Sequence, residues 1–529
     1  MMQFNWLKKK LKNWEIVLSS SDSSVTTQQS TEPRTADLDL RLAWLQQHLS
    51  NSSDLVNHTF VAGAGLKCAL LYIKGMIDLK AIEQHVLTTL GEFAPSWTAE
   101  DISMNIFVYK RLPIAHQSIH FSLQEAYQSL LQGEALLLMD GESRMLALSV
   151  TAFEQRSIQE APNEAVIRGP REAFIESMDT NLTMIRRRLK TPSFKMDLMH
   201  IGTETQTSVA IVYLQGKCKQ ELVNEVKKRL SAIEIDSVLG SSYLEEFIED
   251  YPFSPFPQLQ STERPDVVSA ALLEGRVAII VDGTPIALIA PVTIFMLLQS
   301  AEDYYQRFVA ANWIRAIRLL FLFISLLLPS IYVAITTFHP DIIPERLLIT
   351  VASSREIVPF PALVEAFLME LSFEALREAT VRIPKSIGQS VSIIGALIIG
   401  NAAVEAGIAS AAMVIIVALT GIASFIIPHF DLGLAFRLLR FPIMILAGTF
   451  GLIGIAFGMI LIYLHLLELR SFDLPYLSPI TPLHTNDLKD TILRAPWWGM
   501  KNRPSFFDGK GQSKRLKTRN WGHAREEEE

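Results

Sequence analysis

A run of 43 residues, 386–428, contains a single charged side chain, Glu405. A helix needs about 20 apolar residues, at ~1.5 Å each, to cross the hydrocarbon core of a bilayer. The run is therefore long enough for two membrane spans joined by a tight turn. Two other long apolar runs occur in the chain, and together the runs predict spans at 317–338, 387–406, 409–427 and 441–465.

Apolar residues are concentrated in one part of the chain. Hydrophobic residues make up 49% of the 529 and charged residues 19%, an unusual balance for a soluble protein. Residues 1–313 are mixed, 314–470 consist mainly of apolar runs, and 471–529 are polar again. We therefore expect a polytopic helical membrane domain at 314–470, preceded by a large soluble part and followed by a polar C-terminal tail at 471–529.

The first residues do not form a signal peptide. Residues 1–18 carry lysines but have no continuous apolar core of 7–15 residues and no small-residue cleavage site. Residues 19–33 are almost all small and polar, which is typical of a linker without fixed structure. We therefore expect a basic leader and a disordered linker at 1–53.

The soluble part contains an internal duplication. Residues 66–90 resemble 207–230: each is an apolar strand, a glycine and an amphipathic helix. Residues 129–141 resemble 271–283, and each ends in Asp-Gly between apolar runs, a strong signal for a β-hairpin. The pattern predicts two similar α/β subdomains, at 54–155 and 165–300. Such a pair suits a ligand cleft between the subdomains, and it equally suits a scaffold or oligomerisation domain.

Charges near the first span indicate its orientation. Arg307, Arg315 and Arg318 precede it, so the positive-inside tendency predicts that the α/β subdomains are cytoplasmic. The number of crossings stays open. Four crossings return the C-terminus to the cytoplasm, which suits the basic stretch 510–519, whereas five place that stretch outside.

An amphipathic helix is predicted at 361–383. Glu370, Glu374 and Glu378 recur every four residues, so they lie on one side of a helix. This acidic stripe suits either a helix at the membrane interface or one that lines an aqueous path. Residues 167–192 predict one long helix, in which Arg186 to Arg188 have the pattern of a solvated helix face.

Glu405 has two explanations. If the chain turns at Glu405 to Gly407, the charge lies at a membrane surface at little cost. Otherwise it faces a pore or a helix interface, where Asn401, one turn earlier, can hydrogen-bond to it. Gly451, Gly454 and Gly458 are spaced by three and four residues, so they share a helix face and predict close helix packing.

The sequence gives little support to catalysis. It has no closely spaced Cys/His set, no HExxH, no GxSxG and no phosphate loop, so we expect no enzyme, metal or cofactor. The net charge of −7 gives no reason to expect a nucleic-acid partner. Cys68 and Cys218 lie far apart and suggest no disulfide framework, which suits a reducing compartment.

Several long motifs resemble the A subunit of the GerA family of bacterial spore germination receptors. They cover roughly 165–500 and include VIRGPREAF (166–174), YLEEFIEDYPFSPFPQLQSTERPD (243–266), LLEGRVAIIVDGTP (272–285), SAEDYYQRF (300–308), VPFPALVEAFLMELSFEALREA (358–379), GALIIGNAAVEAGIAS (395–410), IASFIIP (422–428) and HLLELRSFDLPYLSP (465–479). The resemblance implies a nutrient-responsive receptor in the spore inner membrane, working with a transporter-like B subunit and a lipoprotein C subunit.

The resemblance also implies self-oligomerisation into a ligand-gated channel that releases monovalent cations. Glu370, Glu374 and Glu378, with Glu405 and Asn401, are then candidates for the ion path. Two alternatives remain. A secondary transporter would show inverted repeats in the membrane half, but the duplication lies in the soluble half. The other alternative is a membrane-anchored scaffold without its own pore.

Overall fold

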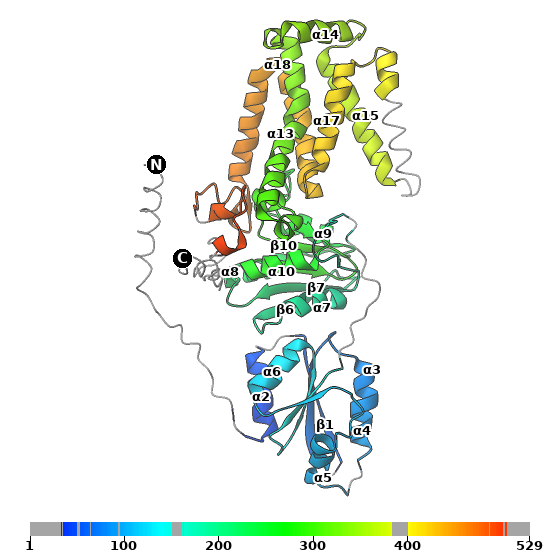
Figure 1. Ribbon diagram of the computed structural model, residues 1–529, viewed down its shortest axis with the longest axis vertical. Coiled ribbons are helices and arrows are strands. Elements are labelled where there is room, and N and C mark those ends of the chain that lie inside the picture. Colours follow the sequence, from blue (N-terminus) through cyan, green and yellow to red (C-terminus); the bar gives the residue numbers. More distant parts are fainter. Residues whose placement is uncertain are drawn as a thin grey trace, which may run out of the picture.

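The computed structural model describes residues 33, 35–49, 53–63, 65–93, 96–150, 161, 163–382, 400–485, 487–500 and 503–504. Its parts are stacked along the long axis: two α/β lobes, then a helical bundle (Figure 1). The leader, the basic stretch 510–519 and most of the predicted span 387–406 lie outside the described residues.

Lobe 1 contains a five-stranded antiparallel sheet in the order β1-β2-β4-β5-β3. Its elements are α2 (Leu38–His48), β1 (Leu55–Ala62), β2 (Leu66–Ile73), α3 (Leu79–Ile82), η2 (Glu83–Leu87), α4 (Thr88–Gly91), α5 (Ala99–Ser103), η3 (Met104–Val108), β3 (Gln117–His120), α6 (Leu123–Gln132), β4 (Ala135–Met139) and β5 (Met145–Leu148).

Lobe 2 has the same plan, with the order β6-β7-β9-β10-β8. Its elements are α7 (Met178–Arg188), β6 (Phe194–Ile201), β7 (Thr207–Leu214), α8 (Gln220–Ser231), α9 (Ser241–Ile248), β8 (Gln260–Thr262), α10 (Pro265–Glu274), β9 (Val277–Val281) and β10 (Ala287–Ala290). Both Asp-Gly pairs lie in hairpins, between β4 and β5 and between β9 and β10, so the hairpin predictions are confirmed.

Each sheet is covered by helices on both faces because its central strands are apolar throughout. In β2, Ala69 and Leu71 face α2 and α6, whereas Cys68 and Leu70 face α3 to α5. This alternation is the two-residue period of a strand. In lobe 2, α7 and α10 cover one face and α8 and α9 the other.

Two predicted segment boundaries are wrong. Helix α2 lies within 1–53, yet Leu42, Trp44 and Leu45 are buried in the core of lobe 1. Asp37 caps this helix by accepting hydrogen bonds from the backbone N–H of residues 39 and 40. The prediction of 167–192 as one helix is also wrong, since only α7 is helical there.

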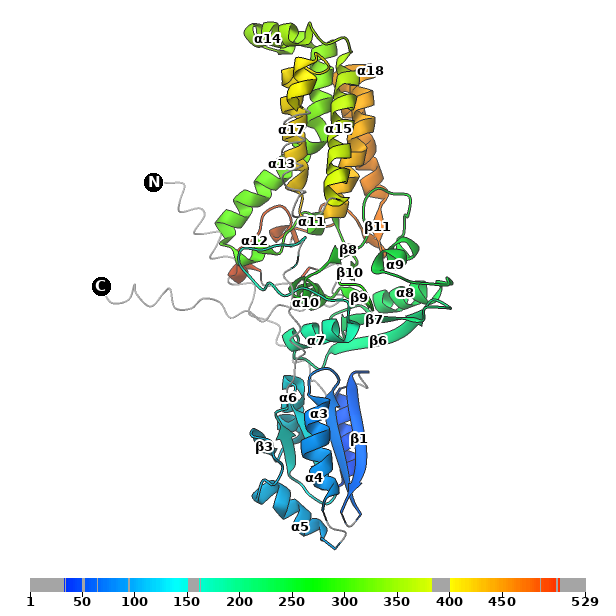
Figure 2. The ribbon, with the colours of Figure 1, turned by 90° about the vertical axis from the view of Figure 1, so that its right-hand side faces the viewer.

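The bundle begins where the chain leaves lobe 2 (Figure 2). Its elements are α11 (Ile294–Leu297), α12 (Glu302–Tyr305), α13 (Phe308–Phe338), η4 (Pro340–Ile342), α14 (Glu345–Arg355), α15 (Ala362–Arg382), a helical turn at 400–405, α17 (Ala411–Phe425) and α18 (Phe430–Glu468). Helix α14, which was not predicted, lies across the end of the bundle farthest from the lobes (Figure 1). Two described helices, α13 and α18, are long and apolar enough to cross a membrane.

The chain reverses direction inside α18. Gly451 has φ 61° and ψ −142°, and its Cα faces Phe338 and His339 at the far end of α13. A Cβ on Gly454 would lie 2.0 Å from the carbonyl oxygen of Leu446, so the two arms pack closely. The prediction of one span at 441–465 is therefore wrong, because 430–450 and 452–468 form a helical hairpin.

Both ends of this hairpin meet lobe 2. The Ser261 hydroxyl donates to Asp431 (3.0 Å) at the start of the first arm, and Ser254 Oγ lies 2.9 Å from His465 Nε2 at the end of the second. Phe256 packs edge-on against Phe436 with ring centroids 5.7 Å apart. The described chain thus enters and leaves the bundle at the same end.

The segment after α18 folds back onto lobe 2. It forms a two-stranded hairpin of β11 (Arg470–Ser471) and β12 (Leu474–Pro475), then η5 (Asp487–Lys489) and η6 (Trp497–Gly499). Tyr476 is fully buried and donates to the carbonyl of Pro257 (2.7 Å). The prediction of a polar tail at 471–529 is therefore wrong for 471–477, where Phe472, Tyr476 and Leu477 are buried in cores shared with lobe 2.

Candidate functional site at the junction of lobe 2 and the bundle

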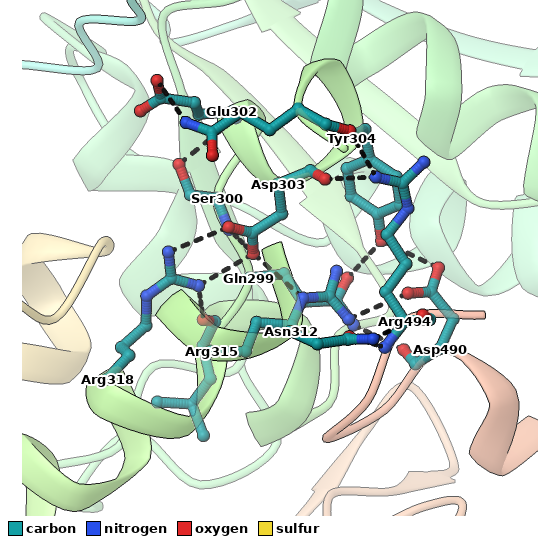
Figure 3. Close-up of polar contacts among 12 residues, drawn as sticks. Gln299, Ser300, Glu302, Asp303, Tyr304, Asn312, Arg315, Arg318, Asp490 and Arg494 are labelled. Carbon is teal, nitrogen blue, oxygen red and sulfur yellow. Dashed lines mark hydrogen bonds and ion pairs between the residues drawn. The ribbon is translucent and has the colours of Figure 1, made fainter. Parts of the chain in front are cut away.

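A buried carboxylate stands where α13 leaves lobe 2. Asp303, in α12, is 2% exposed and accepts hydrogen bonds from Arg318 (2.8 and 3.1 Å) and from Arg315 (3.1 Å) (Figure 3). The backbone N–H of Ser300 donates to the same carboxylate (3.2 Å). Arg318 also donates to the carbonyl of Leu298 (2.7 Å), which fixes the first turns of α13 to the loop between α11 and α12, and the Tyr305 hydroxyl of α12 donates to Asp266 of lobe 2 (2.6 Å).

The C-terminal segment completes this junction. Asp490 accepts from Arg315 (2.9 Å) and lies 2.9 Å from the Tyr304 hydroxyl (Figure 3). Asn312 donates to the carbonyl of Arg494 and accepts from its backbone N–H (3.1 and 2.6 Å). Three separate parts of the chain, namely α12, the start of α13 and residues 490–494, therefore share one buried polar network.

The surroundings of Asp303 favour its charged form. Burial by itself raises the pKa of Asp303, but the hydrogen bonds and the positive charge of Arg318 outweigh it and leave the pKa below its usual value. Burial also raises the pKa of Tyr304, whose hydroxyl donates to Asp490. Asp303 is therefore held as the charged partner of Arg315 and Arg318.

The sequence pointed only partly to this junction. Arg315 and Arg318 precede the first apolar run and served as an orientation signal, but their partner Asp303 lies 12 and 15 residues away in another helix. Asp490 and Arg494 come from a segment predicted to be a tail. Arg494 lies between apolar residues, Leu493 and Ala495, and this is a local signal for a buried charge.

The predicted acidic helix exists as α15, and its carboxylates have different surroundings. Glu370 is 1% exposed and paired with Arg440 of α18. Glu374 lies between Arg377 (3.2 Å) and Arg437 (3.4 Å), and Glu378 is exposed. Of the three carboxylates in the stripe, one is in a buried ion pair, one is half-buried between two arginines, and one is exposed.

A fourth carboxylate on α15 was not predicted to matter. Glu365 is fully buried and accepts hydrogen bonds from the backbone N–H (2.7 Å) and hydroxyl (2.6 Å) of Ser410, at the start of α17. Arg355 of α14 lies 3.6 Å away. A negative charge at a helix N-terminus is stabilised by the helix dipole and unpaired N–H groups. Glu365 thus joins α14, α15 and α17.

Arg440 joins three helices in the bundle core. Pro329 in α13 has no N–H, so the carbonyl of Ser325 lacks its usual partner four residues on. Arg440 Nε donates to this carbonyl (2.8 Å), while its Nη1 donates to Glu370. A neighbouring helix therefore satisfies the carbonyl that the proline frees, and one side chain of α18 fixes both α13 and α15.

Glu405 and Asn401 lie away from these pairs. Both are exposed on the helical turn at 400–405, which ends at Glu405. Gly407 follows with φ 65°, and its N–H donates to the carbonyl of Val404 (3.1 Å). The structure agrees with the first explanation for Glu405, because the chain turns directly after this residue.

Lobes 1 and 2 meet at a second polar contact. Arg186 of α7 is 2% exposed and pairs with Asp54 of lobe 1 (2.8 Å), with its guanidinium over the ring of Phe194. The prediction of a solvated arginine face is therefore wrong for Arg186. Burial lowers the pKa of Arg186, and the charge of Asp54 opposes this.

A cleft of about 760 Å³ lies beside this contact. Its lining residues come from both lobes and their connector: Met76, Gln132, Pro170, Arg171, Glu172, Met184, Arg187, Arg188 and Lys190. Ligand sites commonly have volumes of roughly 300–1,000 Å³. Four of the nine lining residues are cationic and one is acidic, so the cleft favours an anionic group. Within the described residues no set of three His, Cys, Asp or Glu could hold a metal.

Comparison with known proteins identifies relatives over most of the chain. Residues 43–506 match the family model described as Bacillus/Clostridium GerA spore germination protein. An uncharacterized membrane protein, YfkQ, of Bacillus subtilis is 49% identical over 87% of this chain and 89% of its own length. Spore germination protein KA of the same organism is 45% identical over 88% and 85%, and spore germination protein B1 is 39% identical over 89% and 98%.

A crystal structure is also similar in sequence. It is the N-terminal domain of the A subunit of the Bacillus megaterium germinant receptor GerK3, 37% identical, covering 49% of this chain and 95% of its own, with a TM-score of 0.38. Apart from the start of α2, the lobes, the bundle and the junction between them lie in the matched region 43–506. The chain belongs to the GerA family of spore germination proteins.

Proposed function

We propose that this chain is the A subunit of a nutrient germinant receptor in the inner membrane of a bacterial endospore. The bundle crosses the membrane several times, with the lobes on the cytoplasmic side. The subunit works with a transporter-like B subunit, a lipoprotein C subunit and further copies of itself. Its role is to convert nutrient binding into release of monovalent cations. Family membership supports this role.

The path of the chain supports the topology. The hairpin arm 430–450 has 21 residues, about 31 Å of helix, which matches the hydrocarbon thickness. The described chain enters and leaves the bundle beside lobe 2, which supports a topology with the C-terminal segment on the lobes' side of the membrane. This arrangement agrees with an even number of crossings.

The observation that carries the proposal is the network around Asp303. It fixes the first turns of α13 to α12 and to the C-terminal segment through buried charge-assisted hydrogen bonds, and α12 is held to lobe 2 by the Tyr305 hydroxyl, which donates to Asp266 (2.6 Å). A shift of lobe 2 is therefore transmitted to α13 as a rigid displacement. Arg440 then connects α13 to the acidic helix α15. We place ligand recognition in the cationic cleft between the lobes.

The ion path is assigned to the surface of α15. Glu374 and Glu378 are more exposed than Glu370, and in this proposal they attract cations. Glu370 instead holds α15 to α18 through its ion pair with Arg440. Glu405 and Asn401 lie at a helix end and give matched controls. In the alternative, a scaffold without its own pore, the pairing of Glu374 with two arginines leaves no free charge for ions.

Potassium flux separates these functions. The full chain, reconstituted with its B and C subunits in vesicles, is loaded with K⁺ and exposed to nutrient. For a Glu374→Gln/Glu378→Gln variant we expect slower nutrient-triggered K⁺ release at unchanged assembly, and normal release for Glu405→Gln. Unchanged release in the double variant would remove α15 from the path. Absence of nutrient-triggered release in the unmodified complex would favour the scaffold.

A further inference from the structure

The outer surface of the junction is apolar. Six side chains from two segments form it, and we call them the aromatic shelf: Phe308, Val309, Trp313, Leu493, Trp497 and Trp498. The three indoles are 69%, 48% and 50% exposed, in chain order. Phe308 and Trp498 meet edge-on with ring centroids 5.9 Å apart, so the two segments form one continuous surface.

The start of α13 buries its charged side chains and exposes apolar ones, which is the reverse of a surface helix in a soluble protein. Its charged residues Arg315 and Arg318 are buried in the Asp303 network, whereas Trp313 and Val309 face outward. A soluble surface helix places its charges in water and its apolar stripe against the core. Exposed contiguous apolar surface of this kind marks a contact with lipid or protein.

The shelf is continuous with the apolar surface of the bundle. Leu320 and Phe323, one to three turns further along α13, are also exposed. The shelf segment of α13 leans outward beside α12, at the base of the bundle (Figure 2). Indole rings are enriched where a membrane's acyl region meets its headgroups, because one edge is apolar and the N–H is polar.

The chain that follows the shelf is strongly basic. Residues 501–519 contain Lys501, Arg503, Lys510, Lys514, Arg515, Lys517 and Arg519, and one acidic residue, Asp508. Lysine and arginine next to a membrane-surface segment are attracted to anionic phospholipids. A basic protein partner would be repelled by this stretch, and a neutral apolar partner would leave its charge unused. Anionic lipid matches both the shelf and the basic sequence after it, and the exposed apolar residues of α13 that continue from the shelf favour lipid over an acidic protein.

We propose that the aromatic shelf lies in the headgroup layer of an anionic phospholipid membrane, on the same side as the lobes. This rests on the proposed crossing of the membrane by the bundle. The shelf holds the start of α13 and the C-terminal segment at a fixed depth in the membrane surface.

Depth-dependent quenching tests the shelf. The full chain with Cys68→Ala and Cys218→Ala is labelled with an environment-sensitive fluorophore at one new cysteine and reconstituted in phosphatidylcholine/phosphatidylglycerol vesicles. The test site is Trp498→Cys. Ile460→Cys, exposed midway along the second arm of α18, reports the bundle, and Phe121→Cys, exposed in lobe 1, reports bulk water. Quenchers are headgroup nitroxide lipid, mid-chain nitroxide lipid and aqueous iodide.

The expected result is that the label at 498 is quenched more by the headgroup nitroxide than by the mid-chain one and is shielded from iodide. The label at 460 should show the reverse lipid preference, and the label at 121 should respond to iodide alone. Leu493→Cys, 58% exposed, gives a second shelf site if Trp498→Cys folds poorly.

Each other outcome overturns the proposal. Iodide access at 498 with normal deep quenching at 460 would place the shelf in water while the bundle still spans the membrane. Shielding of 498 from both iodide and lipid quenchers would mean that protein covers it. Loss of deep quenching at 460 would remove the proposed spans and the shelf with them. Vesicles without phosphatidylglycerol should weaken the headgroup quenching at 498.

Discussion

The two lobes share one topology but are attached to the rest of the molecule in different ways. Lobe 2 is joined to the bundle through a buried aromatic core around Phe256 and Tyr476 and through the Asp303 network. Lobe 1 meets lobe 2 through Arg186–Asp54 and through polar contacts such as the Ser53 hydroxyl to the carbonyl of Met196 (3.0 Å). The duplication thus supplies one lobe joined to the bundle by an aromatic core and one joined to its neighbour by polar contacts, so we expect lobe 2 to follow the bundle more closely than lobe 1 does.

The largest loss of stability is expected from the Asp303 network, at the attachment of lobe 2 to the bundle. Asp303→Asn leaves Arg315 and Arg318 buried without a full compensating charge, although Asp490 still pairs with Arg315. Removing one partner of a buried ion pair costs roughly 3–5 kcal/mol. We expect a marked loss of thermal stability of the purified full chain in detergent. The exposed Asp341→Asn is the control, and equal melting of the two variants would refute the role of the network.

A smaller loss of stability is expected when the buried ion pair between the lobes is broken. Asp54→Asn removes the partner of Arg186, but this guanidinium keeps donor contacts to the carbonyls of Thr191 and Phe194 (3.3 and 3.4 Å). We expect the free energy of unfolding to fall by about 3 kcal/mol, the lower end of the range for a broken buried ion pair. The distance distribution between spin labels in the two lobes should broaden, while distances between lobe 2 and α13 stay unchanged. Broadening of both distances would show that the lobes move together.

A pH-dependent effect is expected where lobe 2 faces the start of α18. Burial, together with the charges of Asp431, Glu249 and Glu246, raises the pKa of Glu245 to about 8. The folded state then binds more protons than the unfolded state between about pH 4.5 and 8, so stability falls as pH rises through this window. Glu245→Gln should raise the melting temperature more at pH 8 than at pH 5. A pH-independent difference would contradict this.

The smallest effect is expected from the exposed ion pair between the lobes. Lys74 and Asp179 are 3.0 Å apart, with side chains 59% and 56% exposed. Such pairs are worth about 0–1 kcal/mol because water and salt screen them. Lys74→Ala should leave the melting temperature and the inter-lobe distances almost unchanged. A shift as large as that of Asp54→Asn would mean that the exposed pair holds the lobes together.

Local signals in the sequence predicted local structure well. The Asp-Gly hairpins depend on turn chemistry that neighbouring residues specify, and both are present. Helix α15 follows the predicted 361–383 closely because its apolar and acidic periods are helical. Helix α2 was missed because its few core residues lie among polar ones, and their burial depends on a sheet that is formed later in the chain.

Long-range pairings could not be predicted in the same way. The partner of Arg440 on α15 is 70 residues earlier, and its second acceptor, the carbonyl of Ser325, is 115 residues earlier. The reversal at Gly451 was missed because glycines spaced by three and four residues fit both a packed helix face and a hairpin. Only contact between the two arms separates these alternatives.

The tight reversal at Gly451 restricts what this subunit presents to the compartment opposite the lobes. Within the described chain, that face carries only the link at 339–361 with α14, the short turn after Glu405 and the glycine itself. The consequence is an end of the bundle that consists of short links between helices and one helix lying across it (Figure 1).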